Sequence, residues 1–240
     1  AGQYVAVRLF IDALGFKQPR QYSLSDSSTG QYLRISVKNE SPKAEGQDPG
    51  YVSSTLHNKV KENDVIELSA PTGNFFLFNP EKTNVLISAG IGLTPMMAML
   101  NQLLTGNTDP NEKVTLWEKI KANFNKPEPK NPINFIHAVR NSRVHAMKET
   151  VQDLAKKHDN LNVFVAYEQT DSKDVLGRDY HAEGRLNLKQ LDAKMLPKDA
   201  DYYLCGPIPF MQVQHKALLE LGIPAQNIHS EAFGTGGVAL

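Results

Sequence analysis

A candidate phosphate-binding turn lies at residues 90–95, which read GIGLTP between an apolar run at 85–88 and a helix-forming run from Met96. Glycines between a strand and a helix let the backbone bend sharply and approach a pyrophosphate closely. The usual dinucleotide fingerprint, G-x-G-x-x-G, is broken because Pro95 stands where its third glycine belongs. Pro95 nevertheless suits the first turn of a helix, and Thr94 is placed to cap it. Two interpretations stay open here: an anion-binding helix N-terminus, or a glycine turn without a ligand.

The elements that would position this turn change character along the chain. The first third contains stretches that alternate or are β-branched, as strands do, at residues 4–9, 33–38 and 65–68. From about residue 85, short strands alternate with helical spacing, and the strands are expected at 85–88, 133–137, 163–167, 202–205 and 228–233. Such alternation indicates a parallel sheet covered on both faces. We therefore predict an antiparallel β domain over residues 1–80 and a five-stranded parallel α/β domain over 81–240.

The connection at residues 105–132 is longer than the few residues usual after a helix. Within it Val114, Trp117, Ile120 and Phe124 keep helical spacing, which predicts an extra helix. The simpler interpretation is a surface insertion that packs its own apolar face.

Composition limits the classes of function. Lys plus Arg and Asp plus Glu are both 26, so the net charge of zero argues against nucleic acid as a partner. The 240 residues contain no apolar run long enough for a bilayer and no signal peptide. The single cysteine, Cys205, allows no internal disulfide and suits a reducing cytosol. The histidines show no metal-ligand spacing, so we expect no metal, and we expect a cytoplasmic monomer.

Several motifs, in order and spacing, resemble the ferredoxin–NADP reductase-like flavoproteins. Beside the turn at 90–95, they are RQYS at 20–23, CGP at 205–207 and EAFG at 231–234. GQY at 2–4, GYVS at 50–53, HA at 137–138 and VHA at 144–146 are most similar to the reductase portion of flavohemoglobins. The resemblance spans essentially the whole chain and implies an antiparallel FAD-binding barrel followed by a nucleotide-binding domain.

The resemblance implies a role for each matching residue. Tyr22 stacks on the flavin, Arg20 reaches the FAD pyrophosphate, and Ser23 lies near the flavin N5 atom that receives hydride. Cys205 and Glu231 approach the nicotinamide and flavin rings, so Ser23, Cys205 and Glu231 are the expected catalytic residues. The other expected cofactor contacts are Tyr4, Gln21, Val52, Ser53, Gly90, Ile91, Gly92, Leu93, Thr94, Pro95, Gly206, Pro207, Ala232, Phe233, Gly234 and Thr235.

The function implied is hydride transfer from NADH or NADPH to FAD, then single-electron transfer to the haem of an N-terminal globin domain. In flavohemoglobins the complete enzyme converts nitric oxide to nitrate. The alternatives are a stand-alone flavin or ferredoxin-type reductase without a globin partner, and a binding module without catalysis. Because GQY at 2–4 follows one residue and no initiating methionine, we expect a fragment whose barrel lacks its first strands.

The choice between NADH and NADPH depends on the residues after the expected strand at 133–137. No acidic residue stands there to bind a ribose 2′-hydroxyl, whereas Arg140 and Arg143 suit a 2′-phosphate. Either arginine could instead pair with Glu149 or Asp153. Since flavohemoglobins generally prefer NADH, we expect NADH to be the better donor, with appreciable NADPH use through Arg140.

Overall fold

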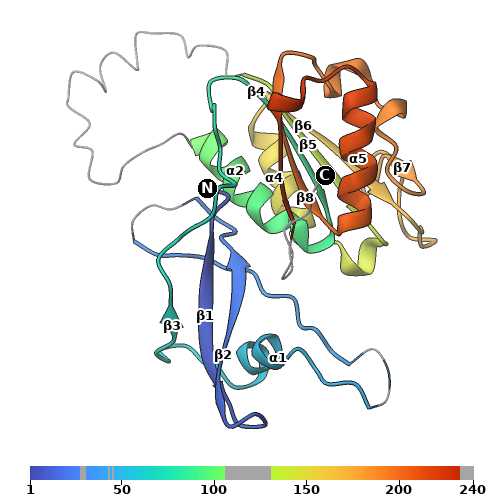
Figure 1. Cartoon of the computed structure of the whole chain (residues 1–240). Helices are drawn as coiled ribbons and strands as arrows, with labels where there is room; N and C mark the ends of the chain where they lie inside the picture. Colours follow the sequence, from blue (N-terminus) through green and yellow to red (C-terminus); the bar gives the residue numbers. More distant parts are fainter. Residues whose placement is uncertain (28–30, 43, 45, 106–130, 233–240) are drawn as a thin grey trace.

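The computed structural model describes residues 1–27, 31–42, 44, 46–105 and 131–232. Two sheets form its framework (Figure 1). The smaller, antiparallel sheet is built from the N-terminal part of the chain, and the larger, parallel sheet from the part after residue 82. The helix-forming insertion expected within 105–132 lies almost wholly outside the described residues.

The antiparallel sheet has the strand order β2-β1-β3. Its strands are β1 (Tyr4–Ile11), β2 (Phe16–Ser23) and β3 (Glu67–Leu68). Strand β1 alternates buried and more exposed residues, and its buried Val7, Leu9 and Ile11 pack against Val52 of helix α1 (Tyr51–Asn58). The alternation of apolar residues that predicted the first strand therefore reflects one buried face.

The parallel sheet has the strand order β7-β6-β5-β4-β8-β9. Its strands are β4 (Thr83–Ala89), β5 (Ile133–Val139), β6 (Leu161–Tyr167), β7 (Ala182–Glu183), β8 (Ala200–Gly206) and β9 (Ile228–Ala232). The covering helices are α2 (Leu93–Thr105), α4 (Lys148–Lys157) and α5 (Ile208–Glu220). Short 3-10 helices are η1 (Gly90–Gly92), η2 (Ser142–Val144), η3 (Leu188–Gln190), η4 (Ala193–Met195) and η5 (Ala225–Asn227).

Helices cover both faces of this sheet. On one face Leu86 and Tyr203 pack with residues of α2 and α4. On the other face Val85 and Tyr202 pack with residues of α5. Strands buried on both faces carry continuous apolar runs, and this explains why the sequence located them.

The expected five parallel strands are present, and the structure adds β7 at the edge of the sheet. The expected strand at 33–38 is wrong, because only Ile35 bridges to another strand segment there, at Leu24. Strand β2 and helix α1 were not expected from the pattern. Strand β2 is mostly exposed, and α1 has few buried residues, so neither carries a clear apolar period.

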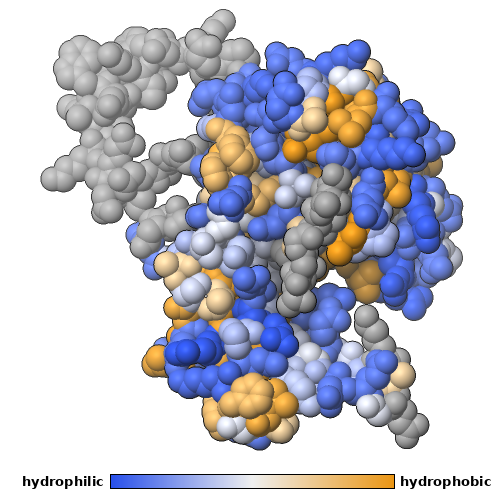
Figure 2. Space-filling view, in the orientation of Figure 1, coloured by the Kyte–Doolittle hydropathy of each residue, from blue (hydrophilic) through white to orange (hydrophobic). Residues whose placement is uncertain are grey.

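Hydrogen bonds link the segments that flank the antiparallel sheet to the elements of the parallel sheet and its helices. The backbone N–H of Phe78 donates to the hydroxyl of Tyr203 at 2.9 Å, and Asn101 of α2 donates to Asp26 at 2.7 Å. The face seen in Figure 2 is largely hydrophilic, with apolar patches, one of them over the hairpin of β1 and β2, where Phe10 and Phe16 are exposed. Across the described ranges, none of the helices has the length and apolar character that spanning a membrane requires.

Candidate functional site

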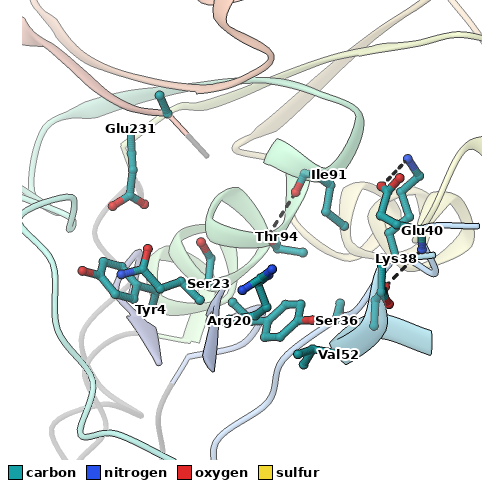
Figure 3. Close-up of a pocket in the computed structure, with 15 residues that line it drawn as sticks. Tyr4, Arg20, Ser23, Ser36, Lys38, Glu40, Val52, Ile91, Thr94 and Glu231 are labelled. Atoms are coloured by element: carbon teal, nitrogen blue, oxygen red, sulfur yellow. Dashed lines mark hydrogen bonds and ion pairs between the residues drawn. The ribbon is translucent and has the colours of Figure 1, made fainter. Parts of the chain in front are cut away.

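A cavity of about 290 Å³ lies between the two sheets. One wall is formed by β1, β2, the segment between β2 and α1, and helix α1. The other wall is formed by the turn before α2, the start of α2 and the end of β9 (Figure 3). The lining residues are Tyr4, Arg20, Gln21, Tyr22, Ser23, Ser36, Lys38, Glu40, Gly50, Val52, Ser53, Ile91, Thr94, Glu231 and Ala232. Most residues expected to contact FAD thus lie around one space.

The register of β1 and β2 brings the aromatic and basic residues of this wall together. Tyr4 pairs with Ser23, and Val7 pairs with Arg20. The Arg20 guanidinium donates only to the neighbouring Pro19 carbonyl, at 2.8 Å, and within the described residues it forms no ion pair. Burial raises the pKa of Tyr22, and the nearby Arg20 charge opposes this shift. An arginine without an acidic partner beside an aromatic ring suits a ligand that carries both phosphate and a flat ring.

Two buried oxygen atoms in the cavity wall have no partner among the described residues: the Ser23 hydroxyl and Oε2 of Glu231. Burial also raises the pKa of Glu231 to about 7. In Figure 3 the Glu231 carboxyl group extends from the end of β9 toward the side of the cavity where Tyr4 lies. Because buried polar atoms are rarely left unpaired, these two oxygens fit the polar edge of a bound group.

The turn after β4 is packed tightly on one side and open on the other. A Cβ atom on Gly92 would lie 2.2 Å from the carbonyl oxygen of Cys205, so only glycine fits between the turn and β8. Gly90 has a φ of 54° and nothing within 4 Å of an added Cβ. The expected cap at Thr94 is wrong, because its hydroxyl donates to the Ile91 carbonyl at 3.0 Å, within a helix that begins at Leu93. Pro95 lies in the first turn of α2, as expected.

Cys205 lies beside the cavity without lining it. It is fully buried on β8, where it pairs with Glu231 of β9. Burial, then the charge of Glu231, raises the pKa of its thiol well above the usual range. The structure thus brings Cys205 and Glu231 together and keeps the thiol protonated.

The remaining expected cofactor contacts are not in the cavity wall. Those at the carboxyl edge of the parallel sheet or at the start of its helices are Gly90, Gly92, Leu93, Pro95, Arg140, Gly206 and Pro207. Those outside the described residues are Phe233, Gly234 and Thr235.

The two arginines after β5 differ in their surroundings. Arg143 forms a bidentate ion pair with Asp171, at 2.9 and 3.1 Å. Asp153 pairs instead with Lys156. The alternative in which Arg143 pairs with Glu149 or Asp153 is therefore wrong. Arg140 is exposed and, within the described part of the chain, forms no ion pair.

Sequence reasoning missed four lining residues: Ser36, Lys38, Glu40 and Gly50. The first three occur at every second position, which places them on one side of an extended segment. That alternation is the available signal, but on its own it predicts a strand at 33–38 and no cavity wall.

Comparison with known proteins agrees with this geometry. The family model of the oxidoreductase NAD-binding domain matches residues 86–216. A flavohemoprotein of Bordetella pertussis is 46% identical over 99% of this chain and 54% of its own length. The chain spans about half the length of the curated relatives it matches.

Solved structures show the same similarity. The flavohem-like FAD/NAD-binding domain of nitric oxide dioxygenase from Vibrio cholerae is 35% identical, with a TM-score of 0.78 over 98% of this chain and 85% of that one. A flavohemoglobin from Malassezia yamatoensis with bound FAD and haem is 26% identical, with a TM-score of 0.70 over 98% of this chain and 51% of that one. The chain therefore belongs to the oxidoreductase NAD-binding domain family, in its flavohemoprotein branch.

Proposed function

We propose that this chain is an NAD(P)H-dependent FAD reductase that supplies electrons to the haem of a globin domain in a longer flavohemoprotein. The observation that carries the proposal is the cavity between the two sheets. Among the described residues it joins an arginine without an acidic partner, two tyrosines and two buried oxygens without a hydrogen-bond partner. The solved relatives support it, since one is described as an FAD/NAD-binding domain and another contains FAD and haem. We place the boundary between the FAD-binding and NAD(P)-binding domains near residue 80.

FAD, when bound, can accept a hydride and give up its electrons one at a time. Arg20 binds its diphosphate, Tyr4 and Tyr22 pack against its ring system, and Ser23 offers its free hydroxyl to the polar edge of that ring. Glu231 holds an ionisable carboxyl group at the same cavity, with a pKa near neutrality. Ser53 and the backbone near Val52 contribute polar groups at the phosphate end.

The nicotinamide nucleotide binds across the turn at 90–95, where Gly90 leaves open space and Gly92 brings the turn against β8. Cys205 is fully buried beside Glu231, and its raised pKa keeps a neutral group next to that carboxyl. Arg140 follows the carboxyl end of β5, and its exposed guanidinium, without an ion pair among the described residues, can bind a ribose 2′-phosphate. NADH is the better donor and NADPH is also used.

In the complete protein the acceptor is haem, and the overall reaction is the oxidation of nitric oxide to nitrate. The protein acts in the cytoplasm, and this part of it is monomeric. The haem acceptor and the nitric oxide reaction rest on the names of the relatives, and the flavohemoproteins among them are about twice as long as the matched region.

A visible spectrum of the purified chain, followed by anaerobic addition of NADH, tests the proposal. We expect flavin absorption that bleaches on addition of NADH and returns when an acceptor is supplied. A chain that binds no flavin even when FAD is added would contradict the proposal.

A further inference from the structure

One end of the cavity contains an ion pair that the proposed roles do not use. Lys38 and Glu40 both line the cavity, and Nζ of Lys38 lies 2.8 Å from Oε1 of Glu40. Figure 3 shows this pair on the side of the cavity where Arg20, Ser36 and Val52 also lie. A carboxylate is an unexpected neighbour for a group that binds phosphate, so its presence calls for a physical account.

The backbone holds Glu40 in place. Its carbonyl oxygen accepts a hydrogen bond from the N–H of Gly50 at 2.8 Å, and its own N–H donates to the Ser53 hydroxyl at 3.3 Å. A Cβ atom on Gly50 would lie 2.8 Å from the Cβ of Glu40, so this glycine allows the close approach. The backbone of Glu40 is thus held against Gly50 and Ser53 at the start of α1, whereas Lys38 carries its charge on a flexible four-carbon stem.

The three charged side chains at this end leave one net positive charge. Arg20 and Lys38 are positive and Glu40 is negative, so Arg20 alone presents an unneutralised charge to an incoming diphosphate. The side chains of Lys38 and Glu40 are 62% and 49% exposed. Ion pairs with such exposure shift an equilibrium by about fivefold or less, so a diphosphate can displace Glu40 from Lys38 at small cost.

We propose that Lys38 is a second cationic contact for the diphosphate of FAD, and that Glu40 restrains it until the dinucleotide binds. The pair sets the affinity for FAD relative to flavins with fewer phosphates. This inference rests on the proposed function, because it assumes that FAD occupies the cavity. Glu40 weakens dinucleotide binding and Lys38 strengthens it, so the two side chains have opposite effects.

The test compares FAD, FMN and riboflavin binding to the flavin-stripped chain by isothermal titration calorimetry. Lys38→Met should weaken FAD by about tenfold, because it removes one charge-assisted contact and leaves Glu40 facing the phosphates. Riboflavin carries no phosphate, so its affinity should stay within about twofold of the parent. Lys156→Met is the matched control, because Lys156 and Asp153 form a pair of similar length and exposure on α4, outside the cavity wall.

Variants of Glu40 distinguish the alternatives better than Lys38→Met alone, because the inference predicts that they bind FAD more tightly. Glu40→Gln should tighten FAD by about threefold, and Lys38→Met with Glu40→Gln should bind FAD more tightly than Lys38→Met alone. Weaker FAD binding in Glu40→Gln would overturn the inference, since Glu40 would then be a ligand contact. Equal losses for FAD and riboflavin in Lys38→Met, or a loss confined to the KM for NADH, would overturn it as well.

These outcomes are separable from failure of the proposed function. If the parent chain binds no flavin of any kind, the proposed function fails. If the parent binds FAD and Lys38→Met binds it equally well, only the inference about Lys38 fails.

Discussion

Burial raises the pKa of Glu231 to about 7, and its Oε2 has no hydrogen-bond partner in the described part of the chain, so its charge changes within the physiological pH range. Below about pH 7 the carboxyl group is neutral, and above it the group is ionised. A negative charge beside the flavin opposes the addition of electrons. Glu231→Gln keeps the neutral form at every pH, so its midpoint potential should exceed that of the parent at pH 8 by about 30 mV and match it at pH 6.

Spectroelectrochemical titration of the flavin at the two pH values makes this measurement. The affinity for NADH should remain within about twofold of the parent, which separates an effect on the flavin from a collapse of the site. Identical potentials in variant and parent at both pH values would exclude this role for Glu231.

Arg140 tests the recognition of NADPH. A charge-assisted contact contributes about 1.5–3 kcal/mol, so Arg140→Ala should lower kcat/KM for NADPH by at least about tenfold and spare NADH. Arg143→Ala is the matched control, because Arg143 is already paired with Asp171 and should not discriminate between the donors. A parallel fall for both donors in Arg140→Ala would mean that the arginine supports the loop after β5.

The site residues that could be predicted from the sequence are those that lie in contiguous motifs. Arg20 to Ser23 lie at the end of one strand, and the register with β1 brings Tyr4 to the same place. Lys38 and Glu40 reach the cavity from an irregular segment whose path depends on backbone contacts with Gly50 and Ser53. No local pattern encodes those contacts, and the sequence alone did not identify this end of the cavity.

At the scale of elements, the turn at 90–95 can pack against β8 only because residue 92 is glycine. Gly92→Ala would place a Cβ atom 2.2 Å from the Cys205 carbonyl oxygen, and β8 must shift to accommodate it. We expect a loss of about 2–3 kcal/mol in the free energy of unfolding, measured by urea denaturation. Gly90→Ala meets no atom but must adopt a φ of 54°, and it should cost about 1 kcal/mol. If Gly92→Ala cost no more than Gly90→Ala, the close approach of the turn to β8 would not limit the residue at position 92.

The same contrast explains which elements the sequence could locate. Strands β4, β5 and β8 are buried along almost their whole length on both faces, so their apolar residues are nearly continuous. Strand β2 is exposed along most of its length, and its eight residues include Pro19 with four charged or amide side chains around it. Residues 33–38 alternate like a strand, but they pair with the rest of the sheet only at Ile35. Periodicity reports burial, and it does not report pairing.

At the scale of the whole molecule, the cavity exists only while the two sheets keep their relative position, since both contribute to its wall. Asp26 contributes to this arrangement. Its side chain is 11% exposed, and it accepts hydrogen bonds from Asn101 of α2 at 2.7 Å and from Tyr32 at 2.9 Å. It also pairs with Arg34 at 2.8 Å. The Asp26 carboxylate thus connects the segment after β2 to helix α2, which packs on the parallel sheet.

Loss of the hydrogen bond from Asn101 to Asp26 should slow catalysis more than loss of the hydrogen bond from Tyr32 to the same carboxylate. Asn101→Ala removes only the contact from α2, at a cost of about 1.5 kcal/mol, and it should lower the rate of flavin reduction by NADH several-fold. Tyr32→Phe removes a hydrogen bond to Asp26 without changing α2, so its rate of flavin reduction should match the parent.

Stopped-flow flavin reduction measures the rates of both variants. Because hydride transfer needs the flavin and the nicotinamide held close by different parts of the molecule, a small change in their relative position is sufficient to slow it. Equal rates in Asn101→Ala and Tyr32→Phe would show that other contacts keep the two sheets in position. One such contact is the hydrogen bond from Phe78, in the segment before β4, to Tyr203 of β8.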